Sequence, residues 1–119
     1  MPLRARLKLT RARMQRISGL DACTTLLELD LSNNNVTAIS GLESLTALRK
    51  LTLTSNRITA ITGLHTLSLL EHLLLQSNLL GSFESLNLDM LAQLPGLRTL
   101  YLCNIDRSQV KGGSGLGCG

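Results

Sequence analysis

Cysteine and histidine are the residues of this chain best suited to nucleophilic catalysis or metal binding, and their spacing favours neither. Cys23, Cys103 and Cys118 are too far apart to match the closely spaced ligand pairs of a zinc site. His65 and His72 are predicted to lie on opposite limbs of a repeat, so they form no close pair, and no acid or histidine is placed to activate Cys103. No glycine-rich phosphate loop follows a predicted strand. The sequence therefore predicts a protein that is not an enzyme and that uses no metal or cofactor.

Alternate residues of the segment 72–76 carry the chemistry of protein recognition: an imidazole at His72, an apolar side chain at Leu74 and an amide at Gln76. Thr99 and Tyr101 add a hydroxyl and an aromatic ring 27 residues further on. A leucine beside a tyrosine is typical of the centre of a protein interface, because the ring offers both apolar area and a hydroxyl. Isolated exposed apolar residues are also common on surfaces that bind nothing. We predict a partner-binding patch here, with a surface that has no partner as the alternative.

Charged residues occupy the same predicted face nearer the N-terminus. Arg6, Glu28 and Lys50 alternate in sign at intervals of 22 residues, and Lys8 and Asp30 do the same. Residues on neighbouring strands lie side by side, and exposed ion pairs of this kind contribute ~0–1 kcal/mol. Glu28, Asp30 and Lys50 therefore belong to the predicted binding face, although pairing among these charges is enough to explain them.

Basic residues concentrate at the start of the chain, which carries a formal net charge of +4. Residues 1–16 contain six basic residues and no acid, whereas the remaining chain contains six basic and eight acidic residues. The segment is a capping repeat with solvent-facing arginines, a mitochondrial transit peptide, or a patch for nucleic acid or an import receptor. The repeat register favours the capping repeat. No aromatic side chains are interleaved to stack on bases, so nucleic acid is disfavoured as a partner.

The composition indicates one repetitive domain that must hold these residues in place. Of 119 residues, 30 are leucine, whereas there is one tyrosine, one phenylalanine and no tryptophan. Such a core is filled by the same branched side chain used many times. No apolar run approaches the ~20 residues of a membrane span, and no secretory segment follows Met1. The odd number of cysteines favours a reducing compartment, and we expect a cytoplasmic protein, with nucleus or cilium as alternatives.

The leucines follow a repeat of 22 residues. The segments 17–20, 39–42 and 61–64 each read Ile-Ser/Thr-Gly-Leu, and the pattern LxxLxLxxNxL begins at 26, 48 and 70. Alternation within LxL predicts a short strand whose leucines point inward, and equivalent strands stack as a parallel sheet. Asn34, Asn56 and Asn78 form a structural ladder whose amides satisfy backbone groups at the turn after each strand. Glycine in the Ile-Ser/Thr-Gly-Leu segment permits a tight bend on the return limb.

The predicted domain organisation follows from this register. A repeat domain covers 1–109, and its repeats are 4–25, 26–47, 48–69, 70–96 and 97–109. The fourth repeat has about five extra residues, which we interpret as a longer helix over Asn87–Gln93 ended by Pro95-Gly96. The segment 110–119 is glycine-rich and is expected to be a flexible tail. An end without a cap exposes a strand edge, so self-association is possible, and a truncated fragment without independent activity stays an alternative.

The repeat length, the Ile-x-Gly-Leu segment and the lack of cysteine-rich caps resemble the intracellular 22-residue subtype of leucine-rich repeat proteins. The resemblance covers about residues 4–105 and departs from the family after Cys103, where the usual C-terminal cap is missing. It implies an α/β solenoid, a short horseshoe with a parallel sheet on the concave face and 3₁₀ or short helices on the convex side. It also implies a non-catalytic module, scaffold or regulatory subunit that binds a protein partner through the concave face. A protein that binds nucleic acid through the basic first repeat is the alternative.

Overall fold

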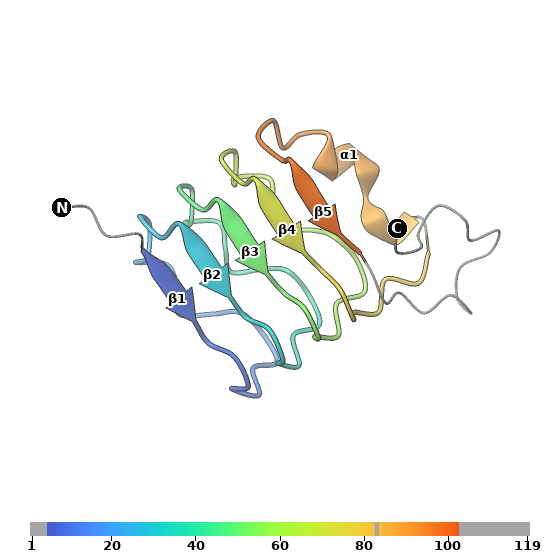
Figure 1. Cartoon of the computed structure of the whole chain (residues 1–119), viewed down its shortest axis with the longest axis horizontal. Coiled ribbons are helices and arrows are strands. Elements are labelled where there is room, and N and C mark those ends of the chain that lie inside the picture. Colours follow the sequence, from blue (N-terminus) through green and yellow to red (C-terminus); the bar gives the residue numbers. More distant parts are fainter. Residues whose placement is uncertain (1–4, 83, 103–119) are drawn as a thin grey trace.

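The fold is a stack of short parallel strands joined by return limbs. The computed structural model describes residues 5–82 and 84–102. Each strand has three residues, and the strands are β1 (Arg6–Lys8), β2 (Glu28–Asp30), β3 (Lys50–Thr52), β4 (His72–Leu74) and β5 (Thr99–Tyr101). They form one sheet in chain order, and every neighbouring pair is parallel (Figure 1). The predicted repeat solenoid is confirmed. We call one strand with its return limb a rung, numbered 1 to 4, with β5 beginning the fifth.

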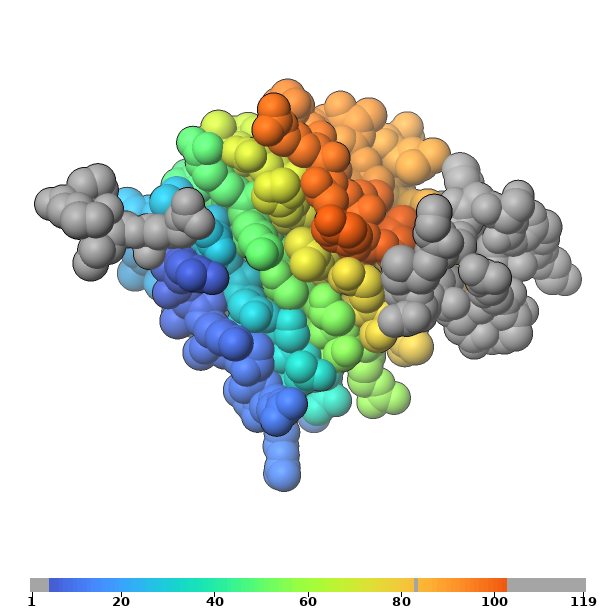
Figure 2. Space-filling model, in the orientation of Figure 1, coloured from blue at the N-terminus to red at the C-terminus, as the bar shows by residue number. Residues whose placement is uncertain are grey.

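Burial within each strand follows the alternation predicted from the sequence. The middle leucine of β2, β3 and β4 is buried, whereas the residues on either side are half-buried. The ladder continues one residue beyond the strands, because Leu31 N donates to Thr52 O at 2.8 Å and Leu53 N donates to Leu74 O at 2.8 Å. In the space-filling view the described rungs run as adjacent diagonal bands from the N-terminal to the C-terminal side (Figure 2).

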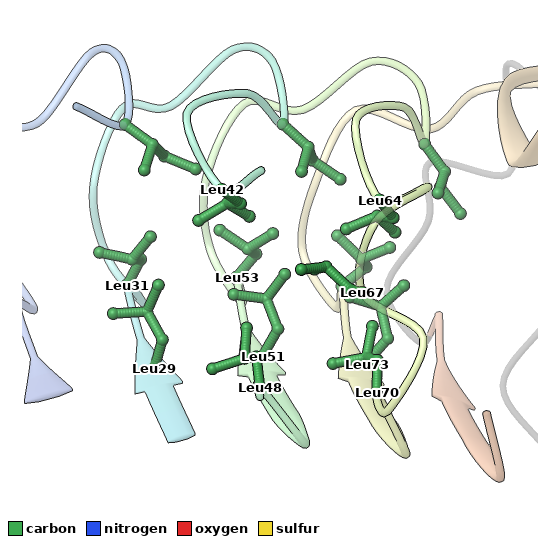
Figure 3. Packing of buried hydrophobic residues seen from close by; sticks show 14 of the residues in the cluster. Leu29, Leu31, Leu42, Leu48, Leu51, Leu53, Leu64, Leu67, Leu70 and Leu73 are labelled. Carbon is green, nitrogen blue, oxygen red and sulfur yellow. The ribbon is translucent and has the colours of Figure 1, made fainter. Parts of the chain in front are cut away.

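The core lies between the sheet and the return limbs. The labelled leucines of neighbouring rungs point into this space and lie next to one another (Figure 3). Leu51, Leu53 and Leu67 are completely inaccessible to solvent. Because each rung uses leucine at the same positions, each buried side chain of rungs 2 and 3 is covered by its own rung and by the rungs on both sides. This arrangement explains the leucine content of the chain.

The buried asparagines join successive rungs through their amides. Asn56 Nδ2 donates to Leu31 O at 2.9 Å on the preceding rung and to Leu53 O at 3.0 Å on its own rung. Its Oδ1 accepts from Val36 N at 3.1 Å. Asn34 and Asn78 make the equivalent bonds. Three backbone groups that the turn would leave without a partner are thus satisfied by one side chain.

The glycines of the return limbs do more than permit a bend. Gly41 and Gly63 have φ values of +74° and +70°, in the left-handed region. A Cβ at Gly41 would overlap the carbonyl oxygen of Ile17 on the preceding rung, and one at Gly63 would overlap that of Ile39. Gly19 has the same conformation, but its Cβ would meet no atom within 4 Å. Glycine at this position therefore sets how closely one return limb approaches the next.

The predicted helix over Asn87–Gln93 is wrong in its length. The structure has a 3₁₀-helix, η1 (Glu84–Leu86), and a single α-helical turn, α1 (Leu88–Leu91), in the return limb between β4 and β5 (Figure 1). Asn87 separates them because it adopts φ 49°, ψ 65°, and its Nδ2 donates to Ile61 O at 3.0 Å. This contact with rung 3 fixes a left-handed residue where a longer helix would need a right-handed one. Rungs 2 and 3 have successive turns at this position instead of helices.

Rung 1 keeps the register of the other rungs, but several of its core residues are less completely buried. Leu7, Leu9 and Met14 are half-buried against the core, and Cys23 packs there as a partly buried free thiol. Ala12 occupies the asparagine position, and its backbone N–H donates to Asn34 Oδ1 at 2.9 Å. Among the described residues, no helix is long and apolar enough to cross a membrane. Cys103, Cys118 and the predicted tail 110–119 lie outside the described residues, and the predicted repeat boundaries stay predictions.

Candidate protein-binding face

The sheet presents two rows of side chains on its outer surface, which we call the concave face. The pairing register aligns Arg6, Glu28, Lys50, His72 and Thr99 in one row, and Lys8, Asp30, Thr52, Leu74 and Tyr101 in the next. These are the rows expected from the 22-residue period. Seven of the eight residues predicted for partner binding are therefore in these rows, and the eighth, Gln76, follows β4 by two residues and borders the same surface.

The charges on the N-terminal half of the concave face are partly compensated. Arg6 Nε lies 3.3 Å from Glu28 Oε1, and the arginine side chain is 67% exposed. Asp30 accepts hydrogen bonds from the backbone N–H and the hydroxyl of Ser32, at 3.0 and 2.6 Å. Lys8 and Asp30 form no ion pair, although the alternation of their charges predicted one. Exposed pairs contribute ~0–1 kcal/mol, so this half needs no partner for its stability.

The C-terminal half of the concave face gathers the predicted patch around a shallow hollow. The hollow has a volume of about 340 Å³ and is lined by Lys50, His72, Leu74, Gln76 and Tyr101. Tyr101 is 46% exposed, and Leu74 is half-buried. Aliphatic, aromatic, amide and cationic groups therefore meet in one place.

Hydrogen bonds between rungs hold two of these polar side chains. His72 Nδ1 lies 3.1 Å from Thr99 Oγ1, and Thr54 Oγ1 donates to Gln76 Oε1 at 3.1 Å. The imidazole and the amide are thus positioned before any partner arrives. Among the described residues, the Lys50 ammonium forms no hydrogen bond or ion pair, so it is available to a ligand.

Glu28, Asp30 and Lys50 border other hollows further along the face. One of about 410 Å³ includes Glu28, Asp30 and Lys50 among its lining residues, and another of about 560 Å³ extends from Glu28 past Lys50 to His72. Lys50 lines all three hollows and connects the charged half of the face to the apolar half. The sheet therefore offers one continuous surface, with charge at one end and apolar groups at the other.

The sequence reasoning missed two features outside the rows. Arg49 Nη1 lies 3.0 Å from Glu71 Oε2 at the amino ends of the strands. A separate hollow of about 460 Å³ is lined by polar residues of three rungs, including Arg16 and Arg57. Both could have been found by extending the 22-residue comparison to every position, since Arg49 and Glu71 are 22 residues apart.

The described parts of the chain bring together no group of side chains of the kind that supports catalysis. Residues 5–82 and 84–102 contain no cluster of three histidine, cysteine or carboxylate side chains that could hold a metal ion. Cys23 is partly buried against the core of rung 1, whereas His72 lies on the outer surface of the sheet, beside the hydroxyl of Thr99.

Comparisons with known proteins agree with this architecture. Residues 24–64 match a family model described as leucine-rich repeats in two copies. A comparison with curated protein sequences finds no match.

Two solved structures from Listeria monocytogenes are similar to this chain. An internalin called internalin F has 30% sequence identity and a TM-score of 0.70, over 81% of this chain and 27% of the other. Internalin C2 has 28% identity and a TM-score of 0.72, over 92% of this chain and 45% of the other. The chain therefore spans less than half of either relative. The intracellular subtype of the repeat stays a prediction from the sequence.

Proposed function

We propose that this chain, a leucine-rich repeat protein by its repeats and its fold, is a non-catalytic module that binds a protein partner through its concave face. Proteins built from such repeats generally mediate protein–protein interaction. We further propose that it acts in the cytoplasm, the compartment that its odd number of cysteines favours.

The observation that carries the proposal is the hollow around Tyr101. Leu74 and Tyr101 sit opposite each other on β4 and β5, and Lys50, His72 and Gln76 surround them. Interface centres favour tyrosine next to aliphatic side chains, with polar groups that satisfy a partner at the edge. Elsewhere on the face, the Arg6–Glu28 pair and the Asp30–Ser32 hydrogen bonds already satisfy charges.

The lining residues indicate what the partner presents. An apolar side chain would cover Leu74 and the ring of Tyr101, whose hydroxyl would hydrogen-bond to a polar group of the partner. A carboxylate would meet the Lys50 ammonium at the border of the hollow. The partner segment is therefore expected to combine an apolar anchor with an acidic neighbour.

Two substitutions in the hollow test the proposal. Leu74→Asp places a charge where the apolar anchor would pack, and Tyr101→Ala removes the ring. Loss of a hot spot reduces affinity by about 30-fold or more. Affinity capture from cell extract, quantified by mass spectrometry, should recover at least one protein with the unaltered chain and lose it with both variants.

Leu69→Asp is the matched control. Leu69 is 48% exposed and lies outside the strands, so the control adds the same charge away from the concave face. Circular dichroism should be unchanged in all three variants. Capture that survives both concave substitutions, or that is lost equally with Leu69→Asp, would show that the partner binds elsewhere.

A further inference from the structure

The turns that follow β1, β2 and β3 contain arginines and no acid. Residues 9–18, 31–40 and 53–62 form these turns on the first three rungs and contain no aspartate or glutamate, whereas Asp30, the last residue of β2, accepts hydrogen bonds from Ser32 and the equivalent segment of rung 4 ends at Glu84. The three turns hold four arginines, which we call the arginine rim: Arg11, Arg13, Arg16 and Arg57. All four are exposed, and none forms an ion pair with another residue in the described parts of the chain.

The fold brings Arg57 to the basic segment from 41 residues beyond Arg16. Asn35 N donates to Met14 O at 2.8 Å, and Arg57 N donates to Val36 O at 2.9 Å, so the three turns are stacked. Arg13, Asn35 and Arg57 are equivalent positions of rungs 1, 2 and 3. At ~4.8 Å per rung, the backbones of Arg13 and Arg57 lie about 10 Å apart, with Asn35 between them. The cationic surface thus extends well beyond the N-terminal segment.

A hollow lies within the arginine rim. It has a volume of about 460 Å³ and is lined by Gln15, Arg16, Asn35, Thr37 and Arg57. These side chains offer two guanidinium groups, two amides and a hydroxyl, all of which can donate hydrogen bonds to an oxyanion. No apolar side chain lines it.

The opposite edge of the sheet shows that the charge of the rim is not a general property of the surface. There, Arg49 is paired with Glu71 at 3.0 Å, and Glu71 lies between Arg49 and Arg98 in the stack. Cations at the amino ends of the strands are therefore accompanied by acids. The four rim arginines form no ion pair within the described residues, and they create a positive potential along their turns.

We propose that the arginine rim binds the phosphate backbone of double-stranded nucleic acid without sequence preference. Arginine, asparagine, glutamine and threonine are the side chains that contact phosphate and sugar. An acidic peptide is less well matched, because protein interfaces include an apolar centre and this hollow has none. A single strand is also less well matched, since no rim residue is aromatic and can stack on a base.

The sequence alone assigns the basic residues to one repeat and disfavours nucleic acid, whereas the fold adds Arg57 of rung 3 to them. The rim is a surface other than the concave face, so either proposal can fail without the other.

Binding to a fluorescently labelled DNA duplex of mixed sequence tests the proposal through its salt dependence. Four neutralised phosphates predict a slope of about −3.6 in log K against log salt, which weakens binding by about 150-fold between roughly 50 and 200 mM NaCl. Arg16→Ala combined with Arg57→Ala should reduce the slope to about −1.8, with about 12-fold weakening over the same range. Fluorescence anisotropy of the full chain measures both.

Arg49→Ala combined with Arg98→Ala is the matched control, because it removes the same charge from the opposite edge. This variant should keep the slope and the affinity of the unaltered chain. Equal losses in both double variants would overturn the proposal in favour of a diffuse effect of net charge. Absence of duplex binding at low salt would also overturn it, as would tighter binding of a glutamate homopolymer or of single-stranded DNA than of the duplex.

Discussion

Rungs 1 and 3 follow the same repeat, yet equivalent residues in them have different surroundings. Leu53 in rung 3 is inaccessible to solvent, whereas Leu9, at the same repeat position, is half-buried. Asn56 bridges two rungs, and the corresponding position in rung 1 is Ala12. The difference indicates that the contribution of a repeat residue to the free energy of unfolding depends on the rungs on both sides of it. Each pair of equivalent positions can therefore be used to measure what a neighbouring rung contributes.

The largest difference is expected for leucine truncation in the core. Leu53→Ala should lower the free energy of unfolding by ~2–5 kcal/mol, because the slot is enclosed by rungs 2 and 4 and a cavity remains. Leu9→Ala should cost less than about 2 kcal/mol, since its slot is open to solvent on one side. Urea unfolding followed by circular dichroism measures both values. Equal losses would mean that burial by a second neighbour adds nothing.

An intermediate effect is expected at the asparagine position. Asn56→Ala removes the partners of Leu31 O, Leu53 O and Val36 N, and each buried group left without a hydrogen bond costs about 1–3 kcal/mol. Partial access of water to the turn should limit the total to about 3 kcal/mol.

The reverse substitution, Ala12→Asn, provides the comparison in rung 1. With no described rung before it to accept the second hydrogen bond, the new amide should change the unfolding free energy by less than about 0.5 kcal/mol. A large stabilisation by Ala12→Asn would contradict the view that the ladder acts between rungs.

The smallest of the three differences is expected at the glycines. Gly19→Ala should cost about 1 kcal/mol, which is the penalty for a left-handed residue with a Cβ and open space around it. Gly63→Ala has the same penalty and also forces its Cβ against Ile39 O, so the total should be about 2–3 kcal/mol. Thermal unfolding of the two variants compares them directly. Equal shifts in Tm would show that rung 3 moves away from rung 2 at little cost.

The parts of the fold that depend on the 22-residue period could be predicted from the sequence. The outward rows follow from counting, because the fixed period places Lys50 beside His72, and the LxxLxL pattern that resumes at Leu97 after the longer fourth repeat places Leu74 beside Tyr101. The asparagine positions follow in the same way. The period carries this information because each rung repeats the same backbone path.

Contacts that occur in one rung and do not follow the repeat could not be predicted from the period. Asn87, expected as the first residue of the helix, lies outside it in a left-handed conformation, and its amide reaches Ile61 O, which is 26 residues away. Asp30 accepts hydrogen bonds from Ser32 and forms no ion pair with Lys8, which the alternation of charges does not reveal. Arg57 joins the rim only when charge is counted across rungs and not along the chain.

The close approach at Gly41 and Gly63 has a geometric consequence for the face on the other side of the molecule. A stack curves when its outer limbs are spaced more widely than its strands, and the bare Cα of glycine lets the outer limbs approach one another closely. Close outer limbs limit the curvature of the stack, and the strands in Figure 1 run side by side. A partner of this protein would therefore lie across several rungs of a weakly curved face and would not be enclosed by that face.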